Sequence, residues 1–210
     1  MAVDRDFDEF VRKKVANIII FFADGQTTSL KRIIKLMFIA DESSVKRYGV
    51  PISWLKYFAW VQGPVPSQMY LELEKQAGIE KNEALRIKNK FQLDGFIKAS
   101  AAARLNANQR SVDITPRVPF DDAEFTEYEL EILREVKEKF GSWSITKLIE
   151  YTHGKNTLWG KVVRSNRLNR VFQYQSKTDF QVAFFPILRG DKFKTFVQAQ
   201  KSLEYQNALI

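Results

Sequence analysis

Few residues in this sequence are suited to catalysis. It contains one histidine, His153, and no cysteine, and no Gly-x-Ser-x-Gly pattern marks a serine nucleophile. A zinc site would need several His or Cys ligands at short spacing, and neither of the common glycine-rich phosphate-binding patterns occurs. Adjacent carboxylates occur at Asp41-Glu42 and Asp121-Asp122, but neighbouring residues on a helix do not face one another. We therefore expect a protein that is not an enzyme and that uses no metal and no cofactor.

Asp41 and His153 are the titratable residues with the most informative surroundings. Asp41 follows Phe38-Ile39-Ala40 in the most apolar stretch of the chain. Because a buried carboxylate must be paired or hydrogen-bonded, one interpretation makes Asp41 a polar anchor that fixes the Gly63–Pro66 corner or meets a cation. The other places it on the wet face of a helix beside Glu42, and the apolar periodicity leaves both open. For His153 we favour a structural role near a helix end over a catalytic one.

Basic residues recur at three-residue steps in the second half of the chain. The net charge is +8, and excess positive charge steers a protein toward acidic partners. If the segment is helical, four residues lie near one face and form a basic stripe: Lys161, Arg164, Arg167 and Arg170. Such a stripe would hold phosphates or an acidic protein patch, and aromatic residues follow it where stacking on bases would need them. The alternative is an ordinary solvated face, because surface Lys and Arg are common.

Large aromatic side chains are the other candidates for contact with a partner. Aromatic residues are enriched where proteins bind one another. The sequence offers Trp54, Tyr57, Trp60, Trp143 and Trp159. Packing in the core is the competing interpretation for each of them.

The elements that must position these residues are mostly helices. Apolar residues at three- and four-residue steps predict one helix over residues 7–23 and another over 30–48. The second helix is apolar nearly all round in its middle, so we expect it to be buried on most sides. Three basic residues are expected to keep its first turns in solvent: Lys31, Arg32 and Lys35.

Turn and capping signals indicate the remaining elements. The rigid corner at residues 63–66 opens a further helix, since proline suits a first helical turn. The capping box over residues 126–129 opens another, for which Gly141 is expected to provide a left-handed end. Short antiparallel strands are expected near residues 52–62 and 86–115. The predicted fold class is mostly α (α+β): a single helical domain with a small antiparallel β element.

Length and composition set wider limits. With 210 residues, 45% of them hydrophobic, the chain can bury one sizeable core. No apolar run approaches the length of a membrane span, and acidic residues near the start argue against a signal peptide. A chain without cysteine forms no disulfides. We expect a cytoplasmic protein with no membrane partner.

Two separated blocks of residues resemble the Panacea domain, the family named for the SocA antitoxin. In the first block, a Lys-Leu helix with an Ala-Asp pair and a Tyr-Gly end precedes Gly-Pro-Val-Pro and a helix that carries Tyr. The matching residues are Lys35, Leu36, Ala40, Asp41, Tyr48, Gly49, Gly63, Pro64, Val65, Pro66 and Tyr70. The second block is Leu148–His153 followed by Trp159, with an insertion before Trp159 relative to the family's signature. The resemblance covers about residues 28–163 of a single domain spanning 1–210, and it leaves 164–210 as a C-terminal extension.

The resemblance implies an antitoxin that neutralises a partner toxin by direct protein–protein binding, with some members acting as proteolytic adapters. The implied partners are a cognate protein toxin, encoded by an adjacent gene, and a protease, in a bacterial, phage or prophage toxin–antitoxin system. We expect the partner to contact Trp60, Tyr70, Trp159, Lys161, Arg164, Arg167 and Arg170. We expect structural roles in the motif for Asp41, Gly49, Gly63, Pro64, Pro66 and His153.

Two other functions stay open at this point. A nucleic-acid-associated regulator, or a mobile-element or phage protein, would use the basic stripe, and its binding would depend on salt because phosphate contacts release counterions. An enzyme of an unrecognised type would have to use an aspartate, a lysine, a tyrosine or His153.

Overall fold

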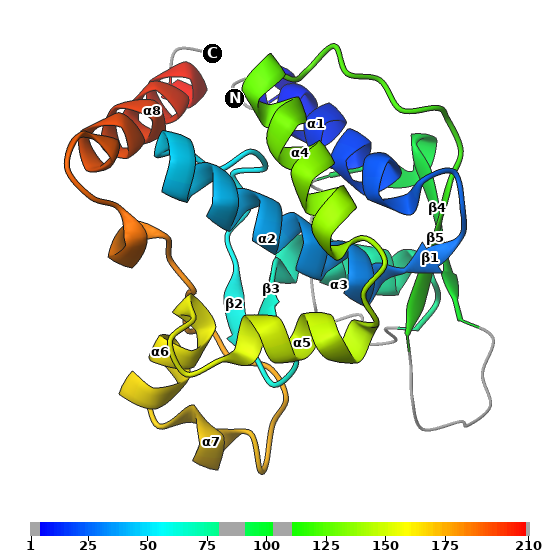
Figure 1. The fold of residues 1–210 in the computed structure, drawn as a ribbon. Helices are drawn as coiled ribbons and strands as arrows, with labels where there is room; N and C mark the ends of the chain where they lie inside the picture. Colours follow the sequence, from blue (N-terminus) through cyan, green and yellow to red (C-terminus); the bar gives the residue numbers. More distant parts are fainter. Residues whose placement is uncertain (1–4, 80–90, 103–110, 209–210) are drawn as a thin grey trace.

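The computed structural model describes residues 5–79, 91–102 and 111–208. Within these ranges the chain forms eight α-helices and five short strands (Figure 1). The helices are α1 (Arg5–Ala23), α2 (Leu30–Tyr48), α3 (Ser67–Gln76), α4 (Glu127–Phe140), α5 (Ile145–His153), α6 (Leu158–Ser165), α7 (Leu168–Val171) and α8 (Asp191–Ala208). The strands are β1 (Thr28–Ser29), β2 (Phe58–Trp60), β3 (Gly63–Val65), β4 (Ile97–Ala101) and β5 (Val112–Pro116). This confirms the predicted fold class, because helices dominate and the strands are short and antiparallel.

Helix α2 crosses the middle of the molecule, with α1, α4 and α5 packed against it (Figure 1). Residues 33–41 are all buried, as expected for a helix that is apolar on nearly every side. The helix ends at Gly49, whose φ of 88° lies in the left-handed region that favours glycine. One expectation was wrong: Lys35 is buried rather than solvated, because β3 and α5 cover its side of the helix. Lys31 and Arg32 are half-buried.

The strands form two separate antiparallel sheets. β1, β5 and β4 form the first sheet in that order, and β4 pairs with β5 over its whole length. β2 and β3 form the second, a hairpin in which Phe58 pairs with Val65 and Trp60 with Gly63. The 63–66 corner is therefore mostly strand, and Pro66 alone borders α3.

The two predicted β regions are only partly occupied by strands. Within 52–62 the strand is β2, and within 86–115 the strands are β4 and most of β5. Residues 86–90 and 103–110 of the second region lie outside the described residues.

Helix α4 begins as the sequence predicts but ends differently. The Glu129 side chain accepts a hydrogen bond from the backbone N–H of Thr126 at 2.9 Å, which confirms the capping box. The expectation for Gly141 was wrong, since its φ is −61°. The right-handed turn continues there because the Arg32 guanidinium donates to the carbonyl groups of Gly141 and Trp143.

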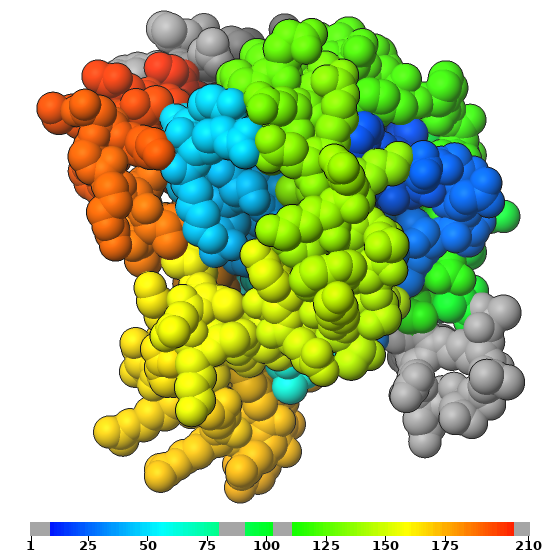
Figure 2. Space-filling model, viewed as in Figure 1, coloured from blue at the N-terminus to red at the C-terminus, as the bar shows by residue number. Residues whose placement is uncertain are grey.

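The residues after α6 belong to the packed fold. A first apolar core includes residues of α1, α2, α4 and β5. A second core joins Phe38 of α2 and Tyr57 to Val182, Phe184 and Phe196 from the C-terminal part of the chain. On the face seen in Figure 2, α2 reaches the surface between α4 and α8. The predicted extension over 164–210 therefore supplies one side of the second core.

The segment over residues 176–182 runs alongside β2. The backbone N–H of Ala59 donates to the Phe180 carbonyl at 2.8 Å, and that of Val61 donates to the Ser176 carbonyl at 2.9 Å. This segment thus covers the edge of β2 that does not pair with β3. None of the helices within the described ranges is both long and apolar enough to cross a bilayer.

Candidate functional site

Asp41 is a buried anchor for the loop that precedes β2. One carboxylate oxygen accepts the backbone N–H groups of Ile52 and Ser53, each at 2.8 Å. The other accepts the hydroxyl groups of Ser53 at 2.5 Å and Tyr57 at 2.8 Å. Burial raises the pKa of Asp41, and the hydrogen bonds from Ser53, Tyr57 and Ile52 oppose the rise. Asp41 is a buried anchor and not a residue of a wet face, but both partners proposed for it were wrong. Its hydrogen bonds among the described residues go to Ile52, Ser53 and Tyr57, not to the 63–66 corner or to a cation.

Gly63 is the point at which the two separated motif blocks meet. Its φ of 104° is a conformation that favours glycine. A Cβ at this position would lie 2.6 Å from Nζ of Lys35 in α2 and 2.8 Å from Nε2 of His153 in α5. Both separations are shorter than nonbonded contact allows, so only a residue without a side chain lets these two nitrogens approach the backbone.

Lys35 is a buried amine, with 2% of its surface exposed. Its Nζ donates a hydrogen bond to the Pro64 carbonyl at 3.2 Å. Burial, and to a smaller extent the charge of Lys31, lower the pKa of Lys35 from 10.5 to about 7. At neutral pH this amine is therefore divided between its charged and neutral forms.

Trp159 is the middle ring of an aromatic stack. The rings of His153 and Trp159 lie 4.0 Å apart with 10° between their planes, and Phe172 lies 6.2 Å from Trp159 at 5°. The indole Nε1 of Trp159 donates to the Trp60 carbonyl at 2.9 Å. The hydrogen bond attaches α6 to the β2–β3 hairpin, and the stack joins α6 to the end of α5 and the end of α7.

The His153 ring is packed against its neighbours, and one of its nitrogen atoms has no hydrogen-bond partner among the described residues. Burial lowers the pKa of His153; the backbone of Gln62 opposes this change and Lys35 adds to it. The Nε2 atom is buried and has no hydrogen-bond partner among the described residues. Packed against Trp159 and Gly63, the ring fits the structural role that we favoured from the sequence.

A pocket of about 190 Å³ lies next to Lys35, and we call it the Lys35 pocket. Its polar and aromatic lining consists mainly of Lys31, Lys35, Trp60, Tyr70, Glu74 and Lys177. The rings of Trp60 and Tyr70 meet edge to face, 5.3 Å apart. Nζ of Lys177 lies 4.9 Å from the centre of the Trp60 ring and 3.5 Å from a carboxylate oxygen of Glu74. The pocket thus combines a buried amine, two aromatic walls and a second cation held over an indole.

The structure places two of the three predicted aromatic contact residues in the lining of this pocket. These are Trp60 and Tyr70, whereas Trp159 is outside the lining and donates a hydrogen bond to the Trp60 carbonyl. Trp60 and Trp159 are each 8% exposed, so most of their area packs against the protein itself. Their assignment to partner binding stays a prediction.

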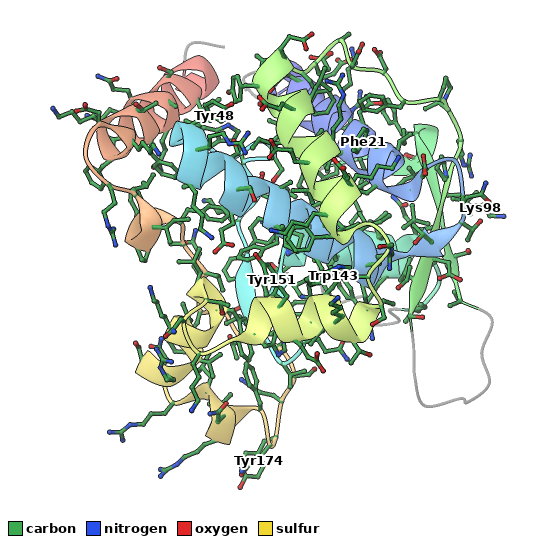
Figure 3. All side chains as sticks on the ribbon, in the orientation of Figure 1. Phe21, Tyr48, Lys98, Trp143, Tyr151 and Tyr174 are labelled. Carbon is green, nitrogen blue, oxygen red and sulfur yellow. The ribbon has the colours of Figure 1, made fainter. Side chains whose placement is uncertain are left out.

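The basic stripe is exposed but is not one continuous helix. Lys161 and Arg164 lie on α6, whereas Arg167 precedes α7 with a φ of 54° and Arg170 lies on α7. Nitrogen-tipped side chains of α6 and α7 extend into solvent, and Tyr174, which is 90% exposed, lies near the lower end of α7 (Figure 3). None of the four basic residues lines the Lys35 pocket. The pocket and the stripe are therefore two distinct candidate surfaces.

Glycine and proline residues of the motif shape the backbone around these sites. At Gly49 a Cβ would lie 3.0 Å from the backbone oxygen of Lys192, so this glycine also lets α8 pack closely. Pro64 presents its carbonyl to Lys35, and the Pro66 carbonyl accepts the backbone N–H of Tyr70 at 3.0 Å in the first turn of α3. Among the described residues, no three His, Asp or Glu side chains gather where they could hold a metal ion.

Sequence reasoning missed the place of four charged residues in the Lys35 pocket. Lys31 and Lys35 were noted as basic residues of a solvated turn, and Glu74 and Lys177 carried no signal of their own. A usable signal was present for Lys35, since it is the one charged residue in the run from Ile33 to Ala40. A lone charge within an apolar helix is expected to have a dedicated environment.

One comparison with known protein families gives a match. The model of the family "Antitoxin SocA-like, Panacea domain" matches residues 33–160, which is more than half of the chain and includes both motif blocks. The chain therefore belongs to the SocA-like Panacea-domain family. No curated protein and no solved structure matches the chain.

Proposed function

We propose that this protein is an antitoxin that neutralises a partner toxin by binding to it directly. The observation that carries the proposal is the family membership over residues 33–160. The geometry is compatible with it, since residues from both motif blocks gather between α2, the β2–β3 hairpin and α5. The toxin would be the product of an adjacent gene, in a bacterial, phage or prophage pair.

Direct neutralisation requires a complementary surface and no reacting groups. The exposed basic stripe would face an acidic patch of the toxin and accelerate encounter, because electrostatic complementarity acts mainly on association rate and specificity. The Lys35 pocket would receive an anchoring side chain, as the centres of protein interfaces often do. In this proposal the protein is not an enzyme, and it acts in the cytoplasm.

The test is co-expression with the product of the adjacent gene. We expect growth arrest by that product to be relieved and the two proteins to copurify. A double charge reversal in the stripe, Lys161→Glu with Arg170→Glu, should slow association. The matched control is Lys98→Glu with Arg134→Glu, which makes the same charge change at exposed positions on β4 and α4. A toxic neighbour that is neither bound nor relieved would reject the proposal.

The proteolytic-adapter role is a further part of the proposal. It requires that the protein shorten the lifetime of its bound toxin in cells that contain the protease. When protein synthesis in the cells is stopped, the amount of toxin should therefore fall faster if the antitoxin is present than if it is absent. An unchanged lifetime in the presence of tight binding would reject the adapter role and leave direct neutralisation in place.

A nucleic-acid-associated regulator is the second candidate function. The observation that favours it is the exposed stripe on α6 and α7, with Tyr174 90% exposed beyond it. Binding to DNA should then weaken steeply with salt, with a slope of about −0.9 for each phosphate contact in a plot of log affinity against log salt concentration. The stripe double variant should reduce that slope, and an absence of binding at low salt would reject this function.

A further inference from the structure

The Lys35 pocket contains a buried amine that no carboxylate of the described residues pairs with. The one acidic residue of its lining is Glu74, which lies beside Lys177. Lys31 and Lys35 lie on the same face of α2, one turn apart, and the charge of Lys31 acts on Lys35. A concave site with an excess of one charge attracts ligands of the opposite charge.

The Lys35 amine has unused capacity for hydrogen bonds. An ammonium group has three N–H donors, and within the described part of the chain one acceptor lies within reach, the Pro64 carbonyl. A buried charged group is costly unless it is paired. Burial, and to a smaller extent the charge of Lys31, lower the pKa of Lys35, and an anion beside the amine would favour its charged form.

The size and walls of the pocket indicate what kind of anion fits. Its volume of about 190 Å³ is smaller than the roughly 300–1,000 Å³ of typical small-molecule sites, so it suits a single side chain. Trp60 and Tyr70 would pack against methylene groups, and Lys35 would meet the charged end. The lining contains lysines and no arginine, whereas arginine provides the bidentate geometry that phosphate groups favour.

We propose that the Lys35 pocket binds a carboxylate, and that in the toxin complex this carboxylate is the side chain of an aspartate or glutamate of the toxin. The second part rests on the proposed antitoxin function. The first part concerns this chain alone and is tested without a partner. Gly63 borders the site, because a Cβ at this position would lie 2.6 Å from the Lys35 amine.

The first experiment uses the purified full chain and N-acetyl-aspartate amide as the probe. The reporter is the indole N–H signal of Trp60 in NMR spectra, since this ring lines the pocket. We expect the probe to shift this signal, and we expect the neutral N-acetyl-asparagine amide to leave it unchanged. Lys35→Met should abolish the shift and Lys98→Met, on exposed β4, should preserve it; Figure 3 shows Lys98 far from α5 and α6.

The same experiment is repeated at several pH values to measure how the affinity for the probe depends on pH. The titratable groups around the amine are Lys31, Tyr70, Glu74, His153 and Lys177. Binding should be about tenfold weaker at pH 8 than at pH 6, because an amine with a pKa of about 7 is mostly charged at the lower pH and mostly neutral at the higher. Equal binding at the two pH values would show that Lys35 does not hold the anion.

Other outcomes overturn one part of the proposal each. Equal binding of the asparagine analogue, or binding of inorganic phosphate in place of the carboxylate, would reject a carboxylate site. If the isolated chain binds the probe but Lys35→Met binds the toxin with unchanged affinity, the toxin does not use the pocket. A loss of toxin affinity of tenfold or more in Lys35→Met, with Lys98→Met unchanged, would support both parts. If the neighbouring product is not a partner at all, the antitoxin function fails while binding of the probe still stands.

Discussion

The buried amine of Lys35 predicts an unusual dependence of stability on pH. In the unfolded chain its pKa is near 10.5, and in the folded protein burial lowers it to about 7. Between these values the unfolded state holds a proton that the folded state has released, so the free energy of unfolding increases as the pH rises. Below pH 7 the amine is charged in both states, and its burial then destabilises the fold.

The size of the effect follows from the two pKa values. Well between them, stability changes by about 1.4 kcal/mol for each pH unit, and the slope is halved at pH 7 itself. From pH 7 to pH 9 the Lys35 contribution is about 2 kcal/mol. This is a large share of the roughly 5–15 kcal/mol that stabilises a typical domain.

The assay compares the wild-type protein with Lys35→Met by urea unfolding at pH 6, 7, 8 and 9. Methionine keeps the length of the side chain and removes the titrating group, so the difference between the two proteins isolates Lys35 from all other groups. We expect the wild type to gain about 2 kcal/mol relative to the variant between pH 7 and pH 9, and the variant to be the more stable protein at pH 6. Parallel curves for the two proteins would show that Lys35 keeps an ordinary pKa, and would refute the reasoning.

Three further substitutions test other parts of the structure by chemical denaturation. Asp41→Leu leaves two buried backbone N–H groups without an acceptor, so it should lower the free energy of unfolding by about 2–6 kcal/mol. The control Glu42→Ala, at a half-buried position of α2, should lower it by about 1 kcal/mol or less. Similar losses of stability in the two variants would contradict the anchor role. Gly63→Ala should lower the free energy of unfolding by about 1–3 kcal/mol more than Gly25→Ala, because both positions have a positive φ but only a Cβ at residue 63 would meet other atoms. Equal losses of stability would mean that the nitrogens near Gly63 move aside freely. Trp60→Ala should lower stability by about 3–5 kcal/mol and harm folding more than partner binding, and normal thermal stability with lost partner affinity would reverse that assignment.

The sequence predicted the elements whose causes are local. Helix α2 follows from apolar residues on nearly every side, and the start of α4 follows from a capping box that needs only four consecutive residues. The end of α4 was not predictable in the same way. Gly141 avoids the left-handed conformation because Arg32, far away in the sequence, binds the carbonyl groups that follow the helix.

The candidate site was harder to predict, because it is formed by contacts between residues that lie far apart in the sequence. Asp41 was recognised as unusual, but its partners lie 11 to 16 residues away in a loop with no regular period. Lys35 matched the family motif and was still expected in solvent, because its acceptor lies on β3, 29 residues later. Lys177 reaches the same pocket from the segment that covers β2, which lies beyond the residues that match the family.

Helix α2 contributes to both apolar cores at once, with Ile34 and Met37 in the first and Phe38 and Val45 in the second. Neither core can come apart without exposing a side of this helix to water. The two halves of the molecule are therefore coupled into one cooperative unit, and the amide protons of α2 should exchange with solvent only when the whole chain opens. A weakening of the C-terminal half will for this reason be felt in the motif residues of α2 as well.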